Sequence, residues 1–256
     1  MFFFVCFLTN FGYNKVGGSM QRYFAKDKIG NQFVLENEDL YHIKTVMRMK
    51  DKDQIYVVFN QITYICCLEN VKQNIQIMMI EEQKNWKQKF PEVVIFVPLL
   101  KEQKMDLILQ KATELGVSKI VPIVTSRSII RVNEERIDKK IERWKRICKE
   151  ASEQAHRNTI PEIAPVMNIM HMKNSDGLAL VCSTTEKEKN MKYVLQKYRD
   201  CDKISVVMGP EGGLSKEEEE YLKEVGYIPI TLGHNIMRVE TVPIFVLSTI
   251  NYEFME

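Results

Sequence analysis

The sequence predicts an α/β protein in which a small β-barrel module precedes a larger domain with a parallel sheet. Residues 21–82 are rich in β-branched and aromatic segments, whereas from residue 93 onward short apolar runs alternate with helical spacing. The polar segment 84–91 between them ends in proline, as linkers often do. The expected parts are an N-terminal extension over residues 1–19, a β-barrel domain over 20–84 and an α/β domain over 91–256.

Composition narrows the class of protein. The 256 residues carry a net charge of +2, which neither favours nor excludes a nucleic-acid partner. The six cysteines form no CxxC pair and the four histidines lack metal-ligand spacing, so we expect reduced thiols, no metal and a cytoplasmic location. The apolar stretch Met1–Leu8 has no basic segment before it and is too short for a bilayer. We therefore expect no membrane association and treat Met20 as the start of the folded chain.

The β-barrel domain is expected to contain a hairpin, a further strand and one helical insert. Strands are predicted over Gln54–Phe59, Ile62–Leu68 and Ile75–Ile80. The dipeptide Asn60-Gln61 is short enough for a hairpin turn between the first two. The spacing over Glu38–Met47 predicts a short helix.

The α/β domain is expected to alternate strands with helices. Its first strand, helix and second strand form a β-α-β unit, which implies parallel strands and a right-handed crossover. Gly116 occupies the position that follows a helix C-terminus, and Asn133 is the expected cap of a long helix with Trp144 and Cys148 on its core stripe. The predicted strands cover residues 93–97, 119–124, 178–182, 204–208 and 228–232, and the other predicted helices cover 102–115, 189–198, 215–225 and 242–254.

The last predicted helix, Val242–Phe254, is apolar on nearly all sides. Thr241 is the expected N-cap, and Pro243 is tolerated in the first turn. A helix of this kind is expected to be buried all round. The pattern fits a core helix and a helix shared with a homodimer interface equally well.

Two glycine-bearing loops, residues 208–214 and 232–241, follow the last two predicted strands. Because the carboxyl ends of parallel strands meet at one edge of a sheet, both loops are expected at the edge where such sheets bind ligands. Glycine lets a ligand ring lie against the backbone. A plain turn that needs a left-handed backbone would also explain the glycines. Neither dinucleotide nor P-loop spacing is present, so a nucleoside without phosphates fits better. Ser215 and Glu218 predict a capping box.

Charged residues suggest two further roles. The segment 127–157 holds ten Lys or Arg and six Asp or Glu. A solvated helix face is the usual interpretation of such a run, and the excess of basic residues, with Arg127 and Arg131 in the preceding loop, adds support for a contact with a nucleic-acid phosphate backbone. Arg22 and Arg48 of the β-barrel domain are weaker candidates, since acids balance the charge there. Glu211 and Glu240 lie in the two loops, where each would act as a general base or, more in keeping with their positions, shape its loop.

Six motifs occur in order between Met20 and the C-terminus: Gln21–Phe24, His42 with Arg48, Gln110–Gly116, Glu150–Asn158, Gly209–Leu214 and Arg238–Thr241. In this order they resemble the 16S ribosomal RNA uracil-N3 methyltransferases, a family of the trefoil-knot (SPOUT) methyltransferases. Each motif alone is weak, but the ordered set is specific.

The resemblance implies a PUA-like β-barrel, a knotted SPOUT domain with a parallel sheet, S-adenosylmethionine as cofactor, a homodimer, and 16S rRNA of the small ribosomal subunit as partner. Arg238 is the expected catalytic residue, because a cation can stabilise the charge that develops on uracil O2 and O4. The expected cofactor-binding residues are Thr184, Met208, Gly209, Pro210, Glu211, Gly212, Gly213, Leu232, Gly233, Ile236, Met237, Arg238, Glu240 and Thr241. The expected RNA-binding residues are Arg22, Arg48, Arg127, Arg131 and Arg157.

The chain departs from the family pattern at His234-Asn235, where Pro-Arg is usual, and at Val242, where Ala is usual. Because Arg238, Glu240 and Thr241 are present, uridine N3 methylation stays the expected reaction. The alternatives are a SPOUT enzyme that methylates another base or a ribose 2′-oxygen, and a non-catalytic RNA-binding assembly factor. A nucleotide-dependent oxidoreductase is disfavoured, because its phosphate and ribose signatures are missing.

Overall fold

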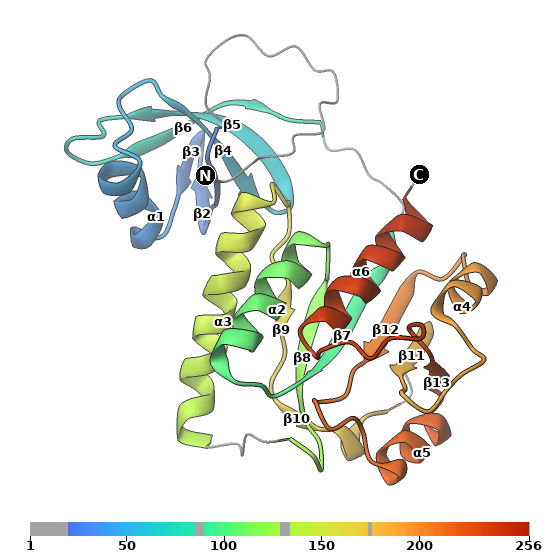
Figure 1. The fold of residues 1–256 in the computed structure, drawn as a ribbon. Helices are drawn as coiled ribbons and strands as arrows, with labels where there is room; N and C mark the ends of the chain where they lie inside the picture. The colour runs from blue at the N-terminus through green and yellow to red at the C-terminus, as the bar shows by residue number, and fades with distance from the viewer. Residues whose placement is uncertain (1–19, 85–89, 129–133, 174–175, 256) are drawn as a thin grey trace.

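The computed structural model describes residues 20–84, 90–128, 134–173 and 176–255, which fold into two sheets with associated helices (Figure 1). The expected extension over residues 1–19, most of the expected linker and the Asn133 cap lie outside these residues. Within them, no helix is long and apolar enough to cross a membrane.

The first sheet has six strands in the order β1-β4-β5-β6-β3-β2, and β1 pairs in parallel with β4 while the other pairs are antiparallel. Its strands are β1 (Arg22–Phe24), β2 (Asp27–Ile29), β3 (Gln32–Val34), β4 (Gln54–Phe59), β5 (Ile62–Glu69) and β6 (Gln76–Glu82). The hairpin prediction is confirmed: Asn60 and Gln61 have φ of 49° and 65°, the left-handed backbone that a tight hairpin turn needs. The predicted helix is α1 (Asn37–Tyr41), continued by a π-helix, η1 (His42–Val46).

The second sheet has seven strands, all parallel, in the order β10-β8-β7-β12-β11-β13, with β9 also paired to β8. Its strands are β7 (Glu92–Pro98), β8 (Lys119–Val124), β9 (Glu162–Ile163), β10 (Met167–Asn168), β11 (Leu178–Cys182), β12 (Lys203–Val207) and β13 (Ile228–Ile230). The five predicted strands are confirmed, although β13 ends two residues early. The pattern missed β9 and β10, because two-residue strands are too short to show a period.

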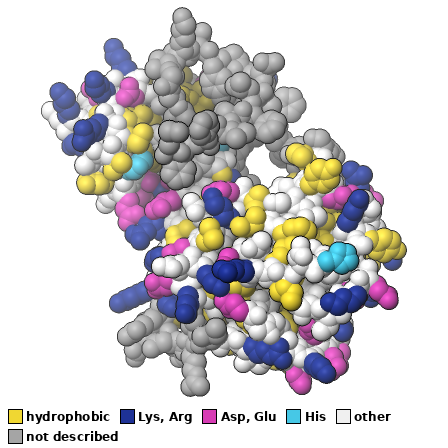
Figure 2. Space-filling view, in the orientation of Figure 1, with side chains coloured by type: hydrophobic (Ala, Val, Ile, Leu, Met, Phe, Trp, Pro, Cys, Tyr) yellow, Lys and Arg dark blue, Asp and Glu magenta, His cyan; other side chains and the backbone are white. Residues whose placement is uncertain are grey.

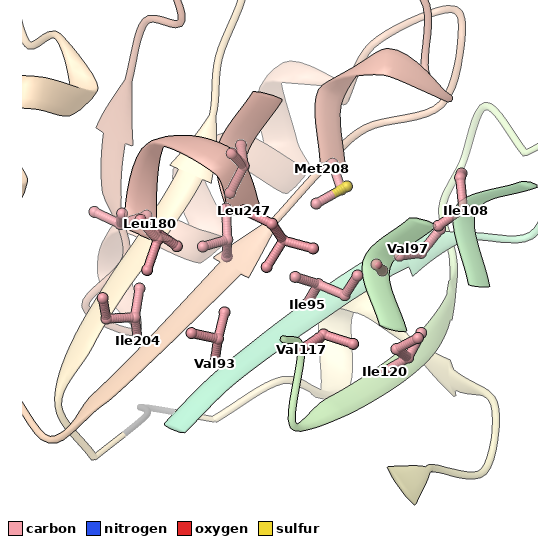
Figure 3. Packing of buried hydrophobic residues seen from close by; sticks show 14 of the residues in the cluster. Val93, Ile95, Val97, Ile108, Val117, Ile120, Leu180, Ile204, Met208 and Leu247 are labelled. Atoms are coloured by element: carbon pink, nitrogen blue, oxygen red, sulfur yellow. The ribbon is translucent and has the colours of Figure 1, made fainter. Parts of the chain in front are cut away.

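Helices cover both faces of the parallel sheet. They are α2 (Glu102–Glu114), α3 (Glu134–Gln154), α4 (Met191–Lys197), α5 (Lys216–Glu224) and α6 (Thr241–Phe254), with a 3-10 turn, η2 (Ile169–His171). Figure 1 shows α3, α2 and α6 in succession over one face, and the α2–α3 and α2–α6 pairs are in contact. Side chains of β7, β11 and β12 meet Leu247 of α6 in the core of this layer (Figure 3). On the other face, Leu222 of α5 and Ile169 of η2 belong to a second core cluster.

Three local predictions at helix ends can be compared with the structure. Gly116 follows α2 with φ of 88°, as a residue after a helix C-terminus requires, so that prediction is confirmed. The prediction that Thr241 caps α6 is wrong: Thr241 is the first helical residue, and Glu240 at the N-cap position makes no side-chain capping bond. The Ser215–Glu218 capping box at the start of α5 is present in full.

Helix α6 is not buried all round within one chain, contrary to the sequence prediction. Val246, Leu247 and Ile250 are buried against the sheet. Phe245 and Tyr252, in contrast, are 38% and 79% exposed. The helix packs on the sheet and on its neighbours α2 and α4, so its remaining apolar face has no cover within the described part of the chain.

Polar contacts join α1 and β1 to the C-terminal end of α3 and to the residues that follow it. Lys149 Nζ lies 2.5 Å from the buried carboxylate of Asp39 and 2.8 Å from that of Glu153. Arg22 Nη1 donates to Asn158 Oδ1 at 2.5 Å and to the Arg157 carbonyl oxygen at 3.1 Å. The two parts of the chain therefore share buried ionic and hydrogen-bonded contacts rather than a linker alone.

The Asp39–Lys149–Glu153 cluster predicts a pH-dependent stability. Two carboxylates share one lysine, and burial raises the pKa of Glu153 from 4.5 to about 7. Between those values the folded chain holds a proton that the unfolded chain releases. The free energy of unfolding should therefore fall as pH rises from 4.5 to about 7, by on the order of 1–3 kcal/mol.

Urea unfolding of the wild type and of Glu153→Gln at both pH values measures this effect. The Glu153→Gln variant should lose this pH-dependent part of the unfolding free energy. Glu142→Gln, an exposed position on the same helix that pairs with Lys145, should keep it. Identical pH dependence in the wild type and Glu153→Gln would contradict the assignment.

Candidate functional site

A cavity of about 450 Å³ opens where β11, β12 and β13 end. Three segments wall it, and each begins at or just after the carboxyl end of one strand: residues 182–187, 208–214 and 231–239. The parallel pairing of β12 with β11 and of β11 with β13 brings these segments together. A cavity at this edge is where open α/β sheets bind ligands.

The first glycine loop is held in one shape by sterics and by a neighbouring loop. A Cβ added to Gly209 would lie 3.0 Å from the Leu214 nitrogen, and Gly213 has φ of 70°, so both positions require glycine. Arg127, in the loop after β8, donates from Nη1 to the Gly212 carbonyl oxygen at 2.7 Å. The Ser126 amide donates to Glu218 Oε1 at 2.6 Å, which ties the same two loops at the start of α5.

The second glycine loop turns at Gly233, which has φ of 120°. Its tip is open to solvent: the Ile236 side chain is 91% exposed. Arg238 is also exposed, and its guanidinium makes no hydrogen bond or ion pair with any residue that the structure describes. The backbone carbonyl of Arg238 accepts from the Thr241 amide at 2.9 Å and so connects the loop to α6.

Lys104 of α2 links the two glycine loops. Its Nζ lies 2.8 Å from Glu211 Oε1 in the first loop and 3.2 Å from Glu240 Oε2 at the end of the second. The hydrogen bond from Lys104 lowers the pKa of Glu211. A backbone hydrogen bond, with a further contribution from Lys104, lowers the pKa of Glu240. Both carboxylates are therefore poor proton acceptors near neutral pH, which favours loop shaping over the general-base alternative.

Most of the residues expected to bind a cofactor line the cavity. Those that do are Thr184, Met208, Gly209, Pro210, Glu211, Gly213, Leu232, Gly233, Ile236, Met237 and Arg238. Gly212, Glu240 and Thr241 do not. The Gly212 carbonyl faces Arg127, Glu240 pairs with Lys104, and Thr241 begins α6.

Sequence reasoning missed several residues of the cavity wall. Lys104 is one, and its partners lie more than 100 positions away along the chain, so no local pattern could connect them. Further ones lie around the end of β11 and on α5, among them Cys182, Ser183, Lys187 and Glu219, and Thr231 and Val239 flank the second glycine loop. Burial raises the pKa of the Cys182 thiol to about 12, so this cysteine is not a nucleophile near neutral pH.

The arginines expected to contact RNA differ in what they do. Arg22 and Arg157 are engaged inside the protein: Arg157 donates to the Thr113 and Val117 carbonyl oxygens at 2.6 and 2.7 Å, and burial lowers its pKa to about 10. Arg127 is exposed but holds the first glycine loop. Arg48 is exposed, with φ of 52°. Arg131 lies outside the described residues.

Among the described residues, no three His, Cys, Asp or Glu side chains are placed to hold a metal ion. The cavity is instead walled by backbone, apolar side chains and a few charged groups. Such a lining suits an organic ligand with polar edges.

Comparison with protein families identifies the class. A model of the RNA methyltransferase domain matches residues 87–251, and a model of the RNA methyltransferase PUA domain matches residues 35–77. The chain therefore belongs to the RNA methyltransferase family, with a PUA domain at its N-terminus and an α/β domain carrying the parallel sheet. This confirms the family resemblance and the fold class read from the sequence.

Individual relatives agree with this assignment. The chain is 32% identical to Ribosomal RNA small subunit methyltransferase E of Bacillus subtilis, over 91% of this chain and 97% of that protein. It is 30% identical to the protein of the same name in Mesomycoplasma hyopneumoniae, over 90% and 98%. Among solved structures, the Neisseria gonorrhoeae enzyme of that name, bound to S-adenosyl methionine, matches with a TM-score of 0.81 and 25% identity over 91% of this chain and 98% of that one.

The double contact of Lys104 predicts that one substitution loosens both glycine loops. Lys104→Met removes the shared cation, and partly exposed ion pairs of this kind contribute modestly, so amide exchange in residues 209–214 and 233–240 should accelerate roughly three- to tenfold. Hydrogen exchange followed by mass spectrometry measures both loops at once. Lys111→Met, which removes an ion pair with Glu114 on the same helix, is the matched control and should leave both loops unchanged.

Proposed function

We propose that this protein transfers a methyl group from S-adenosylmethionine to N3 of a uridine in 16S ribosomal RNA of the small ribosomal subunit. The observation that carries the proposal is the cavity between two glycine loops in a chain of the RNA methyltransferase family. The relatives named above support the substrate, and the Neisseria gonorrhoeae enzyme supports the cofactor. A cytoplasmic location, alongside the ribosome, is part of the same proposal.

The residues of the cavity fit this cofactor. The volume of about 450 Å³ lies in the range of small-molecule sites. Backbone at Gly209, Gly213 and Gly233 can approach an adenine ring closely, and Met208 and Leu232 supply apolar walls. When bound, the cofactor supplies an electrophilic methyl group on its sulfonium. The protein's contribution is to orient the acceptor, exclude water and stabilise charge.

Arg238 is the side chain best placed to act on the acceptor base. N3 of uracil loses a proton as it is methylated, and the resulting charge spreads onto O2 and O4. The Arg238 guanidinium lies at the cavity wall and makes no hydrogen bond or ion pair with a described residue, so it can donate to those oxygens. Because N3 is on the Watson–Crick edge, the target nucleotide must be unpaired to reach Arg238.

The same proposal assigns a role to each of the two parts of the chain. Residues 20–84 would serve RNA recognition and residues 91–256 catalysis, with the last part of the chain threaded as a trefoil knot. The convergence of three strand ends on one cavity supports catalysis in the second of these parts. Arg48 is the best-supported RNA contact of those expected, because it is exposed on the PUA domain and has no competing structural bond with a described residue.

The enzyme is also proposed to work as a homodimer. Hydrophobic side chains gather over α6 on the visible face (Figure 2). Two large apolar residues of this helix, Phe245 and Tyr252, are exposed, and their spacing of seven residues places them on one side of the helix. Helix α6 begins directly after Arg238–Glu240, so a partner packed on it would lie beside the cavity and complete the enclosure of the site.

The dimer proposal predicts a change in mass on substitution of the exposed face of α6. Tyr252→Glu places a charge there and should shift the protein from twice the chain mass to the 30.0 kDa of a single chain in light scattering. Tyr41→Glu, at another exposed tyrosine on the PUA domain, is the control and should leave the mass unchanged. A wild-type protein that elutes at the single-chain mass would contradict the proposal.

The reaction is tested by nucleoside mass spectrometry of small-subunit RNA. Cells lacking the protein should lose 3-methyluridine, and the wild-type gene should restore it. Arg238→Ala should restore it poorly, with turnover reduced roughly 100-fold or more if the guanidinium stabilises the developing charge. The S-adenosylmethionine affinity of purified Arg238→Ala is measured as well. An affinity equal to that of the wild type shows that the substitution impairs the methyl transfer and not cofactor binding.

Retention of 3-methyluridine in the deleted cells would rule out the proposed substrate. Loss of a different methylated nucleoside would identify another base or a ribose 2′-oxygen instead. No change in any nucleoside, together with no cofactor binding, would point to a non-catalytic assembly factor.

A further inference from the structure

Glu219 is a buried carboxylate on the cavity wall. It lies on α5, only 9% exposed, in the part of the wall formed with the end of β11. Its neighbours on the helix differ: Glu218 is used in the capping box, and Glu220 is exposed. Burying an ionised carboxylate has a high free-energy cost unless a cation or several hydrogen bonds compensate it.

The protein compensates Glu219 only in part. The Ser183 hydroxyl lies 3.3 Å from Oε1 and 3.2 Å from Oε2, and the Thr185 hydroxyl lies 3.1 Å from Oε2. A serine hydroxyl has one proton, so it serves only one of the two oxygens at a time. An ionised carboxylate accepts about four hydrogen bonds, so Glu219, which lines the cavity, keeps capacity for a further partner.

No cation of the described chain neutralises Glu219. None of the ion pairs formed by the lysines, arginines and histidines that the structure describes includes the Glu219 carboxylate. Lys187 lines the same cavity, but its Nζ donates to the Thr184 carbonyl oxygen at 2.9 Å. Lys104, on the opposite wall, is shared between Glu211 and Glu240. The cavity therefore holds one carboxylate that lacks a partner of opposite charge.

We propose that Glu219 is the anionic contact for the positively charged methionine portion of the cofactor. The inference rests on the proposed function, because S-adenosylmethionine carries two cations, the sulfonium and the α-ammonium. A carboxylate in a site sheltered from water attracts either one strongly. Ser183 and Thr185 position Glu219: the Ser183 oxygen also accepts from the Thr185 amide at 3.1 Å, which fixes the loop that presents both hydroxyls.

The test is calorimetric titration of the full-length protein and of Glu219→Gln with three compounds. S-adenosylmethionine carries both cations, S-adenosylhomocysteine keeps only the ammonium, and 5′-methylthioadenosine has neither but retains the adenine and ribose. Glu219→Gln keeps the shape of the side chain and removes its charge. A charge-assisted contact predicts a loss of S-adenosylmethionine affinity of roughly 10- to 100-fold, with little change for 5′-methylthioadenosine.

Glu220→Gln is the matched control, since it removes the neighbouring exposed charge and should bind all three compounds like the wild type. Thermal unfolding verifies that Glu219→Gln is folded. Should it not be, Glu219→Leu removes the charge with an apolar side chain that favours burial. If Glu219→Gln loses as much affinity for S-adenosylhomocysteine as for S-adenosylmethionine, the contact is with the ammonium. If its affinity for S-adenosylhomocysteine is unchanged, the contact is with the sulfonium. Both outcomes support the proposal.

Two results would overturn the inference while leaving the proposed function intact. One is unchanged S-adenosylmethionine affinity in Glu219→Gln. The other is an equal loss for all three compounds, which indicates a ribose contact or a purely structural role. A wild-type protein that binds none of the three would overturn the proposed function, and this inference with it.

Discussion

The parallel pairing of β12 with β11 and of β11 with β13 is the constraint on which the rest of the site depends. Parallel strands end at the same edge, so three chain segments that are distant in sequence emerge side by side. Each then contributes a different wall. The segment after β11 brings hydroxyls, the one after β12 brings glycines, and the one after β13 brings the exposed Arg238. The loops are therefore specialised, while the sheet alone brings them together.

Charged side chains convert this proximity into a fixed shape. Lys104 bridges the two glycine loops, and Arg127 holds the carbonyl of Gly212 from the opposite side. Basic side chains also join the PUA domain to the α/β domain: Lys149 pairs with Asp39, and Arg22 donates to Asn158. Several of the basic residues of segment 127–157, among them Arg127, Lys149 and Arg157, thus bond to other parts of the protein. A count of charges along a sequence overestimates the cations available to RNA.

What the sequence could predict follows from the range of the interactions. The Ser215–Glu218 box, the Gly116 terminus and the Asn60-Gln61 hairpin depend on neighbours within four residues, and all are present. The five main strands coincide with short apolar runs, and these were also predicted from the sequence. The contacts of Lys104 and of Glu219 were not predicted, because they join distant parts of the chain. The Thr241 cap failed for a related reason: Glu240, paired with Lys104, takes the N-cap position.

The junction between the PUA domain and α3 has a consequence for how a substrate is chosen. Asp39, Lys149 and Glu153 join α1 to α3, and Arg22 joins β1 to Asn158, so two separate attachments resist rotation of one domain against the other. In the proposed function, the PUA domain holds the RNA at a fixed distance from the cavity where the base reacts, because the two domains cannot rotate against each other. Two uridines with the same flanking bases would be distinguished by the three-dimensional spacing that the ribosomal RNA gives them. An RNA whose folded shape does not match that spacing would be a poor substrate even where its sequence is identical.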